Sequence, residues 1–169
     1  MKVALIVAMD REGGIGKNND LMWHLPSDMK FFKEKTAGQI VVMGRKNYDS
    51  IPEKYRPLPN RENVILTRNS SFEAENCQVF NSMEACLEHY KNETDRIVFI
   101  IGGGEIYRQA LELNCVEEMF ITHVDKVYDA ETFFPKFDES KWAVTEIASH
   151  EMDDKHEAGY RIMNYKRNY

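Results

Sequence analysis

The segment Arg96–Tyr107, with the sequence RIVFIIGGGEIY, joins an apolar run to a glycine turn and then to a helix-like segment. The run Arg96–Ile101 has strand length and is apolar at almost every position, which is typical of a strand covered on both faces. The three glycines that follow allow the backbone to approach a ligand closely, and a helix beginning there offers free N–H groups to a phosphate. The segment therefore predicts a strand–turn–helix unit with either a phosphate loop or a plain tight turn at its centre.

Apolar runs of strand length and helix-like segments alternate on either side of this unit. The other strand-like runs are Lys2–Met9, Gln39–Met43, Asn63–Thr67, Gln78–Phe80 and Met119–Val124. The helix-like segments are Ser27–Lys35, Arg45–Ser50, Met83–Lys91 and Glu105–Leu113. Pro26 and Ser27 are placed to begin the first of these helices, and Ser82 is placed to cap the third. The alternation predicts an α/β fold, with a mainly parallel sheet and about four flanking helices.

The last third of the chain departs from this alternation. Trp142–Ser149 and Gly159–Lys166 are two strand-like runs joined by the polar stretch Glu151–Ala158. Because no helix-like segment separates them, they predict an antiparallel pair added to one edge of the sheet. The chain has 169 residues without repeats or a long linker. We therefore expect one α/β domain over residues 1–169, with a mixed, mostly parallel sheet.

Charge and hydropathy exclude several classes of partner. Lys and Arg total 22 and Asp and Glu total 28, which gives a net charge of −6. A mildly acidic chain is a poor general binder of nucleic acid or of anionic membranes. The longest apolar run, Val3–Met9, is far shorter than the roughly 18–20 residues of a membrane-spanning helix, and no signal peptide is evident. We expect a cytoplasmic protein with no nucleic-acid or membrane partner.

The cysteines and histidines show no metal-binding pattern. Cys77, Cys86 and Cys115 are widely spaced and form no CxxC motif, which favours reduced thiols. The five histidines show no HExxH-like spacing. No metal site is therefore predicted.

A second strand-to-helix turn carries cations. Met43–Asn47 contains Arg45 and Lys46, and Arg68 follows the next strand-like run. The carboxyl ends of parallel strands share one edge of the sheet, where α/β proteins bind ligands. These cations and the glycine turn indicate a binding site for a dinucleotide with an extra phosphate. The alternative is that Arg45 and Lys46 are only an exposed basic pair. The usual dinucleotide fingerprint fits poorly, since Tyr107 stands at its third glycine position.

A lone acid with aromatic neighbours marks a second kind of site. Asp28 is followed by Phe31 and Phe32, which share its helix face. Such a slot raises the pKa of a carboxyl group and favours a ligand with paired N–H donors. The alternative is a helix N-terminal Asp that only complements the helix dipole. Asp10–Asn19 is glycine-rich and is interpreted as either a surface loop or a mobile flap over the site.

These motifs resemble, in order and spacing, those of the dihydrofolate reductase family in its bacterial chromosomal form. The resemblance covers nearly the whole chain. It is carried by Gly14–Gly16, Leu21–Asp28, Val42–Lys46, Arg56–Arg61, Asn63–Arg68, Ile101–Tyr107 and Thr132–Pro135. It implies an eight-stranded mixed sheet with four helices. Within the single domain it implies an adenosine-binding subdomain at roughly residues 39–95, the remainder forming the loop and substrate subdomain.

The resemblance implies NADPH-dependent reduction of 7,8-dihydrofolate to 5,6,7,8-tetrahydrofolate, with hydride transfer to C6 and protonation at N5, in support of one-carbon metabolism. The implied partners are small molecules, namely dihydrofolate and antifolate inhibitors, and the protein is expected to be a monomer. Two alternatives remain open. One is a reductase of another pteridine or of a pyrimidine nucleotide on the same fold, and the other is a non-catalytic dinucleotide-binding module.

Four residues resemble the family's catalytic group. Asp28 resembles the acid that binds the 2-amino and N3 edge of the pterin and promotes protonation at N5. Thr122 would hydrogen-bond to Asp28, and Trp23 would hold an ordered water near the pterin. Leu21 lies on the flap that closes over the cofactor.

The resemblance also implies the residues of the substrate pocket. Its walls would be Ile6, Ala8, Met29, Phe32, Ile51, Leu58 and Ile101. Arg61 resembles the partner of the folate α-carboxylate, for which a planar bidentate guanidinium is well suited. Lys33 and Arg56 are placed to contact the glutamyl tail.

The implied cofactor site draws on the two strand-end turns and the flap. Arg45 and Arg68 resemble contacts to the 2′-phosphate. The pyrophosphate would be held by Lys46, Asn47, Gly102, Gly103, Gly104, Glu105, Ile106 and Tyr107. Ala8, Ile15 and Gly16 would flank the nicotinamide. The remaining cofactor candidates are Asn19, Leu21, Gly44, Leu66, Thr67 and Thr132.

The sequence departs from the family pattern near both expected sites. Met22 replaces the usual proline before Trp23, and Asn60 replaces glycine before Arg61. Glu53–Tyr55 resembles an insertion. Ala130–Glu131 stands where a Gly-Asp pair is more usual, in the loop that contacts the flap. None of these changes removes a group that the chemistry requires.

Overall fold

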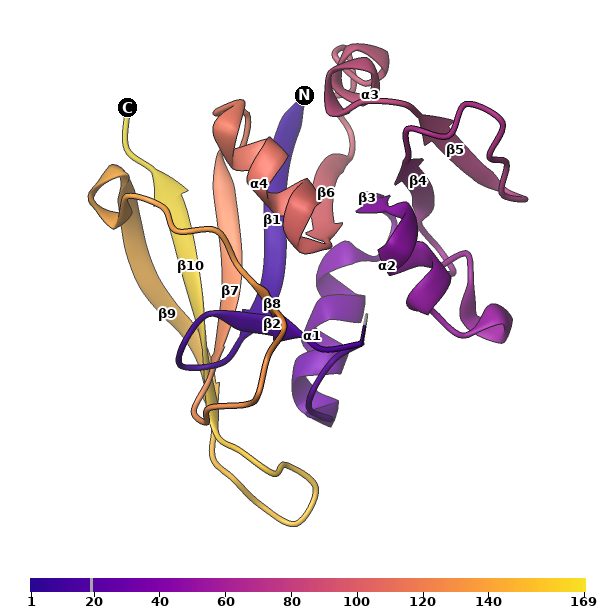
Figure 1. The fold of residues 1–169 in the computed structure, drawn as a ribbon. Coiled ribbons are helices and arrows are strands. Elements are labelled where there is room, and N and C mark those ends of the chain that lie inside the picture. The colour runs from indigo at the N-terminus through magenta and orange to yellow at the C-terminus, as the bar shows by residue number, and fades with distance from the viewer. Residues whose placement is uncertain (19) are drawn as a thin grey trace.

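The structure is a computed structural model that describes residues 1–18 and 20–169. Its strands, drawn in Figure 1, are β1 (Lys2–Met9), β2 (Gly14–Gly16), β3 (Ile40–Gly44), β4 (Glu62–Leu66), β5 (Cys77–Phe80), β6 (Ile97–Gly102), β7 (Glu118–Val124), β8 (Thr132–Phe133), β9 (Trp142–His150) and β10 (Tyr160–Arg167). Among the described residues, eight of these strands form the central sheet, in the order β5-β4-β3-β6-β1-β7-β10-β9.

The direction of the strands follows the expected pattern. Neighbouring strands from β5 to β7 are parallel, whereas β10 runs antiparallel to both β7 and β9. Figure 1 shows the β9–β10 hairpin at one edge of the sheet and β5 at the other. The predicted mixed, mostly parallel sheet with an antiparallel C-terminal pair is confirmed.

Four α-helices lie within the described residues, namely α1 (Pro26–Thr36), α2 (Arg45–Ser50), α3 (Met83–His89) and α4 (Gly104–Glu112). Short 3-10 helices lie at Glu53–Tyr55, the apparent insertion, and at Glu139–Lys141. Ser82 caps α3 as predicted, because its side chain accepts a hydrogen bond from the Ala85 N–H at 3.0 Å. Ser27 does not cap α1. Its hydroxyl bonds instead to His156 and Tyr160, and α1 begins directly after Leu25 with Pro26 in its first turn.

The strands bury alternate residues in two apolar layers, although their sequences are nearly continuous apolar runs. In β1, Leu5 belongs to a core shared with Met83 of α3 and Ile106 of α4. Its neighbour Ile6 belongs to a second core, against which Phe31 of α1 packs. Because helices cover both faces of the sheet, no strand in its centre needs a polar face.

A small antiparallel sheet of β2 and β8, which the sequence did not indicate, lies beside the main sheet. The glycine-rich segment expected to be a loop or flap therefore contains a short strand. A Cβ atom at Gly14 would lie 2.5 Å from the Cβ of Ala130. Glycine is thus required for the close approach of the two segments.

Asp10 holds together the two segments that pair as β2 and β8. Its side chain is buried, and one carboxylate oxygen accepts hydrogen bonds from the N–H groups of Glu12 at 2.9 Å and Gly14 at 2.8 Å. The other oxygen accepts one from the Tyr128 N–H at 2.9 Å. A buried carboxylate is tolerated here because three donors replace its lost hydration.

Replacing Asp10 by Asn should lower the free energy of unfolding by about 1–3 kcal/mol, since an NH₂ group would then face a backbone N–H. Urea denaturation measures this change. Glu12→Gln alters an exposed side chain two residues further on and should change stability by less than about 0.5 kcal/mol. Equal stability of the Asp10→Asn variant and the parent would show that Asp10 does not hold the loop.

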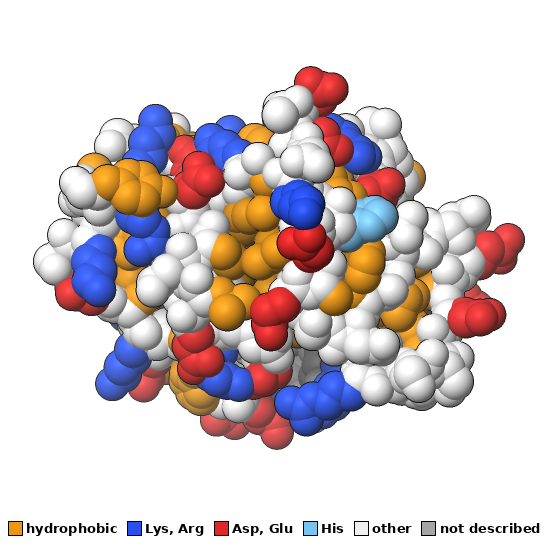
Figure 2. All heavy atoms as spheres, turned by 90° about the horizontal axis from the view of Figure 1, so that it is seen from above, with side chains coloured by type: hydrophobic (Ala, Val, Ile, Leu, Met, Phe, Trp, Pro, Cys, Tyr) orange, Lys and Arg blue, Asp and Glu red, His pale blue; other side chains and the backbone are white. Residues whose placement is uncertain are grey.

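Surface charges of opposite sign are mixed. Figure 2, which views the molecule from above, shows Lys and Arg side chains interspersed with Asp and Glu side chains. Exposed and half-buried ion pairs include Lys2–Glu118 at 2.9 Å and Arg96–Glu93 at 2.7 Å. Across residues 1–18 and 20–169, no helix has both the length and the apolarity to cross a membrane.

Candidate active site

The carboxyl ends of four adjacent strands define the candidate active site. The sheet places β3, β6, β1 and β7 side by side, and all four are parallel. Helix α2 begins immediately after β3, with Gly44 as its N-cap, and α4 begins after β6, with Gly103 as its N-cap. Two helix N-termini, with their unpaired N–H groups, therefore lie on neighbouring strand ends, the arrangement that suits an anionic ligand.

The glycine turn after β6 has a conformation that only glycine adopts readily. Gly102 has φ +133°, and a Cβ atom there would lie 3.4 Å from the Tyr107 hydroxyl and 3.6 Å from Asn47. The hydroxyl of Tyr107 lies 2.8 Å from the carbonyl oxygens of both Ile6 and Ile101. Tyr107 thus ties the start of α4 to β1 and β6, which holds the turn in place.

Glycines also bring the cofactor candidates of separate segments together. A Cβ atom at Gly44 would lie 3.0 Å from Ile106 of α4. A Cβ atom at Gly104 would lie 2.9 Å from the Thr132 side chain, with Ile15 at 3.8 Å. Candidates from β2, β8 and both helix N-termini therefore meet at one place. Gly16 lies in β2, Glu105 lies in α4, and Gly103 is the N-cap residue of α4.

The predicted phosphate-binding cations follow the neighbouring strands β3 and β4. The Arg45 guanidinium lies over the Phe72 ring at 4.3 Å, and its Nε is 3.5 Å from an Asp49 carboxylate oxygen. Lys46 is exposed and lines an open pocket of about 270 Å³ together with Asn18, Asp20, Asp49 and Ser50. Arg68 is exposed just beyond the end of β4, after Leu66 and Thr67.

Asp28 lies in the first turn of α1 and points to the end of β7. One of its carboxylate oxygens accepts a hydrogen bond from the Thr122 hydroxyl at 2.7 Å, as expected. Thr122 is buried and is paired with Ala8 across the β1–β7 ladder. Burial raises the pKa of Asp28 above its ordinary value, and the Thr122 hydrogen bond opposes this in part.

The expected pocket walls fall in two apolar clusters. Ile6 is buried in the core layer against which Phe32, Ile51, Leu58 and Ile101 pack. Ala8 packs with Trp23 in a third cluster. Met29 and Leu21 are about half exposed, at 49 % and 52 %. Met29 and Leu21 thus have more exposed surface than the other expected walls, and the arrangement of the walls around Asp28 stays a prediction.

The three cations expected at the substrate tail lie in different environments. Arg61 is half-buried; its Nη1 donates to the Thr36 hydroxyl at 3.1 Å and its Nε to the Pro59 carbonyl at 2.9 Å. Burial lowers the pKa of Arg61. Lys33 is exposed on α1.

Arg56 has an unforeseen role. Its Nη1 lies 3.0 Å from the Asp49 carbonyl, 3.1 Å from that of Ile51 and 3.4 Å from that of Tyr48. These carbonyls lie at the C-terminal end of α2, so Arg56 caps that helix. A contact between Arg56 and the glutamyl tail stays a prediction.

The flap is tied to the segment opposite it by a residue that departs from the family pattern. The Glu131 carboxylate accepts a hydrogen bond from the Asn18 N–H at 2.8 Å, and the Glu131 N–H donates to the Gly16 carbonyl at 2.9 Å. Trp23 is buried against Tyr128, with ring centroids 5.1 Å apart. Asn19, a cofactor candidate, lies outside the described residues.

Sequence reasoning missed two groups that position the site. Asp10, described above, holds the flap from below. At the start of α1, the Ser27 N–H donates to Nε2 of His156 at 3.2 Å, and the Ser27 hydroxyl bonds to both His156 and Tyr160. The charge of Asp10 at the end of an apolar strand was a usable signal for the first group. The second joins residues about 130 positions apart and had none.

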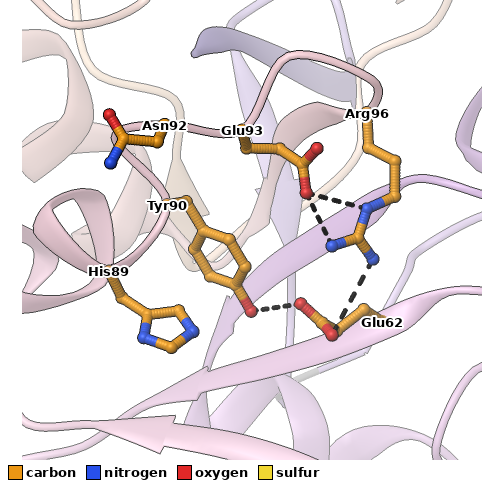
Figure 3. A pocket seen from close by; sticks show the side chains of 6 residues that line it. All are labelled: Glu62, His89, Tyr90, Asn92, Glu93 and Arg96. Carbon is orange, nitrogen blue, oxygen red and sulfur yellow. Dashed lines mark hydrogen bonds and ion pairs between the residues drawn. The ribbon is translucent and has the colours of Figure 1, made fainter.

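A second pocket, of about 340 Å³, lies at the amino ends of the strands and is distinct from this site. Figure 3 shows its lining, in which the buried Tyr90 hydroxyl donates to the Glu62 carboxylate. Arg96 lies between Glu93, at 2.7 Å, and Glu62, at 3.8 Å. Burial and the neighbouring Glu62 raise the pKa of Tyr90. Four of its polar side chains, Tyr90, Glu62, Arg96 and Glu93, are thus paired with one another.

Tyr90→Phe should lower the free energy of unfolding by about 1–2 kcal/mol, because the half-buried Glu62 loses a donor. Turnover should stay within twofold of the parent at saturating ligand. Thermal or urea denaturation and a steady-state assay measure the two effects. Tyr55→Phe, at an exposed tyrosine, is the matched control, and a loss of activity in Tyr90→Phe alone would contradict the separation of the two pockets.

Fold and site together define an α/β protein with two helix N-termini at neighbouring strand ends and a single buried acid, Asp28, bonded to Thr122. Comparison with known proteins specifies the family. The family model described as "Dihydrofolate reductase" matches residues 2–167. The chain belongs to the dihydrofolate reductase family, as the motifs implied.

Individual relatives agree over nearly the full length. The chain is 37 % identical to a dihydrofolate reductase of Staphylococcus haemolyticus over 167 residues, covering 99 % of this chain and 96 % of that protein. It is 33 % identical to one of Bacillus subtilis, covering 98 % and 94 %. A solved dihydrofolate reductase from Enterococcus faecalis, complexed with NADP(H) and RAB-propyl, superposes with a TM-score of 0.88 at 34 % identity, covering 99 % of this chain and 97 % of that one. The predicted family, fold and enzyme class are confirmed.

Proposed function

We propose that the protein reduces 7,8-dihydrofolate to 5,6,7,8-tetrahydrofolate with NADPH, and that Asp28 and Thr122 form the centre of the reaction site. The observation that carries the assignment of residues is the hydrogen bond that the Asp28 carboxylate accepts from the Thr122 hydroxyl at 2.7 Å. The family relationship supports the reaction.

The chemistry of Asp28 suits the pterin edge. A carboxylate accepts two parallel hydrogen bonds, which matches the 2-amino and N3 donors of the pterin. Because burial raises its pKa, the carboxyl group exchanges a proton at a higher pH than an exposed Asp. Asp28 would thereby orient the pterin and promote protonation at N5, while Trp23 would hold a water nearby. Leu21, on the flap, would close over the ligand and exclude other water.

The cofactor proposal rests on how the turns are built. Gly44 and Gly104 stand where a Cβ atom would lie within 3.0 Å of Ile106 and Thr132, and each begins or precedes a helix with free N–H groups. These groups would hold the pyrophosphate, and Arg45 and Arg68 the 2′-phosphate. When bound, NADPH supplies the hydride, and the protein contributes alignment and electrostatics.

The decisive experiment follows the loss of absorbance at 340 nm with NADPH and a panel of substrates. Turnover of dihydrofolate, with none of other pteridines or of pyrimidine nucleotides, is the expected result. Preference for another substrate would establish the alternative reductase. Cofactor binding by calorimetry, with neither turnover nor binding of a folate analogue, would establish the non-catalytic module.

Arg61→Gln should raise KM for dihydrofolate about 10- to 100-fold with little change in kcat, because a charged hydrogen bond to the α-carboxylate contributes about 1.5–3 kcal/mol. Steady-state kinetics measure the split. Arg61 also donates to Thr36 and Pro59, so a melting curve must show that the variant is folded. Arg61→Lys keeps the charge but not the bidentate geometry, so its KM should lie between those of the parent and of Arg61→Gln. An unchanged KM would remove Arg61 from the site.

We further propose that the protein works as a monomer in the cytoplasm on small molecules, with residues 39–95 as an adenosine-binding subdomain and with antifolates competing for the Asp28 pocket. The net charge of −6 supports the exclusion of nucleic acid and anionic membranes. Light scattering after gel filtration, against a chain mass of 19.8 kDa, tests the monomer.

A further inference from the structure

The turn that joins β9 to β10 gathers three metal-ligating side chains. His150 ends β9, and Asp153 and His156 lie in the connecting segment 151–159. One ligand atom from each residue lies within 4.8 Å of the others. His156 Nδ1 is 2.8 Å from one oxygen of Asp153, and His150 Nε2 is 3.6 Å from the other. None of the three belongs to the folate or cofactor site.

The hydrogen bonds around His150 leave a lone pair directed at Asp153. Nδ1 of His150 lies 2.6 Å from the carbonyl oxygen of Glu151. A carbonyl only accepts, so Nδ1 carries the proton and Nε2 of the neutral ring has its lone pair free. Nε2 and the Asp153 carboxylate oxygen are then two acceptors that face each other. A cation between them resolves this, and a carbonyl on the far nitrogen is the usual second contact of a metal-binding histidine.

The three side chains are held in place before any ion binds. His156 is buried, at 5 % exposure, and its ring lies 3.9 Å from that of His150. The His150 ring also stacks on Tyr160, at 5.7 Å and 11°. Asp153 accepts hydrogen bonds from the N–H groups of Lys155 at 2.9 Å and His156 at 2.8 Å. Little ordering remains to oppose binding.

We propose that His150, Asp153 and His156 form a binding site for a divalent transition-metal ion of the zinc and cobalt class. Two imidazole nitrogens and one carboxylate are the ligands that such ions prefer, whereas Mg²⁺ and Ca²⁺ prefer oxygen alone. With three protein ligands, water completes the coordination. The five histidines lacked a recognisable metal spacing because a turn between strands, and not a helix, brings these residues together.

Binding at His156 changes its contact with the helix that carries Asp28. Without a metal, Nε2 accepts from the Ser27 N–H at 3.2 Å, so the ring proton is on Nδ1 and is donated to Asp153. A metal on Nδ1 moves that proton to Nε2, which then donates to the Ser27 hydroxyl at 2.8 Å. The ring stays neutral, and the Ser27 N–H loses its acceptor. The Ser27 amide therefore reports on the site.

The test is a titration of the metal-free protein with Co²⁺ at pH 7.5, followed by its visible absorption, and then displacement by Zn²⁺. One Co²⁺ per chain is the expected stoichiometry. His150→Gln and Asp153→Asn, which alter side chains at the surface, should each weaken binding at least about tenfold. His89→Gln removes an exposed histidine on α3 and should leave binding unchanged. Melting curves verify that each variant is folded.

Two results would overturn the proposal. The first is the absence of saturable Co²⁺ binding, or a loss of Co²⁺ affinity that is equal in His150→Gln and His89→Gln. The other comes from amide NMR spectra with added Zn²⁺. The Ser27 resonance should shift in the parent and stay in place in His150→Gln. A Ser27 resonance that does not move while Zn²⁺ binds would exclude His156 as a ligand.

Discussion

Asp28→Asn is expected to lower turnover at neutral pH by about a hundredfold to ten-thousandfold, the usual range for loss of an acid–base group. Asn is nearly the same size and still accepts a hydrogen bond from Thr122, so the pocket keeps its shape. It cannot exchange a proton or accept both pterin donors. Stopped-flow measurement of hydride transfer, with NADPH affinity determined separately, is the appropriate assay. NADPH affinity should be unchanged, because Asp28 is on α1 whereas the proposed phosphate contacts are on α2, on α4 and just after β4.

The pH dependence of the same variant gives an independent check. The pKa of Asp28 is raised by burial above its ordinary value of 3.8. If its carboxyl group supports protonation at N5, the rate in the parent should fall as pH rises through that raised pKa. The rate of the Asp28→Asn variant should be low at all pH values and should not show this fall with rising pH. An equal loss of NADPH binding, or a parent-like pH profile, would show that Asp28 has another role.

At neutral pH, Asp28→Asn should raise the stability of the protein although it lowers its activity. A folded-state pKa above the unfolded one means that the native state favours the protonated carboxyl. This contribution is fully present below about pH 4 and is lost as pH rises through the raised pKa. At neutral pH the buried charge therefore costs stability, and Asp28→Asn should unfold at a higher temperature than the parent. The difference should shrink as the pH approaches 4 or so.

Joint neutralisation of Arg45 and Arg68 is the second large expected effect. Each Arg45→Gln or Arg68→Gln change should weaken NADPH binding about tenfold or more, since a charged hydrogen bond to phosphate contributes about 1.5–3 kcal/mol. The double variant should lose about a hundredfold or more. NADH, which has no 2′-phosphate, should be affected little. Equilibrium fluorescence titration with both cofactors measures these affinities.

Salt and a matched control separate local contacts from overall charge. The net charge is −6, so general attraction does not bring an anionic cofactor to the protein. NADPH affinity in the parent should fall with ionic strength and do so less steeply in the double variant. Lys136→Gln with Lys141→Gln makes the same change in net charge at exposed positions that are not among the proposed ligand contacts. If that control weakens NADPH binding equally, the assignment of the two arginines is wrong.

The backbone was predictable from the sequence wherever local pattern decides it. Arg96–Ile101 followed by three glycines predicted β6, the turn and α4 to within one residue of their observed ends. Apolar runs without alternation indicated a sheet covered on both faces. The β2–β8 pair was missed because it has five residues in all and forms through close approach at Gly14, which leaves no periodicity to detect.

Side-chain contacts across the sheet were predictable only through the family resemblance. The hydrogen bond between Thr122 and Asp28 joins residues 94 positions apart, and no local signal links them. The capping of α2 by Arg56 was missed because the sequence does not show whether an arginine binds backbone carbonyls or the carboxylate of a ligand. The His150–Asp153–His156 cluster was missed for a similar reason, since its geometry exists only once the hairpin is formed.

Helix α2 lies between residues proposed for the two ligand subsites. Its first residues, Arg45 and Lys46, face the proposed phosphates, and its last carbonyls accept hydrogen bonds from Arg56, which leads directly into the segment of Leu58 and Arg61. We therefore expect that a displacement of this six-residue helix by one ligand changes the affinity for the other ligand. Such coupling is reciprocal, so the factor by which NADPH changes the affinity for a folate analogue must equal the factor by which the analogue changes the affinity for NADPH. Shortening the Arg56 side chain should bring both factors toward one.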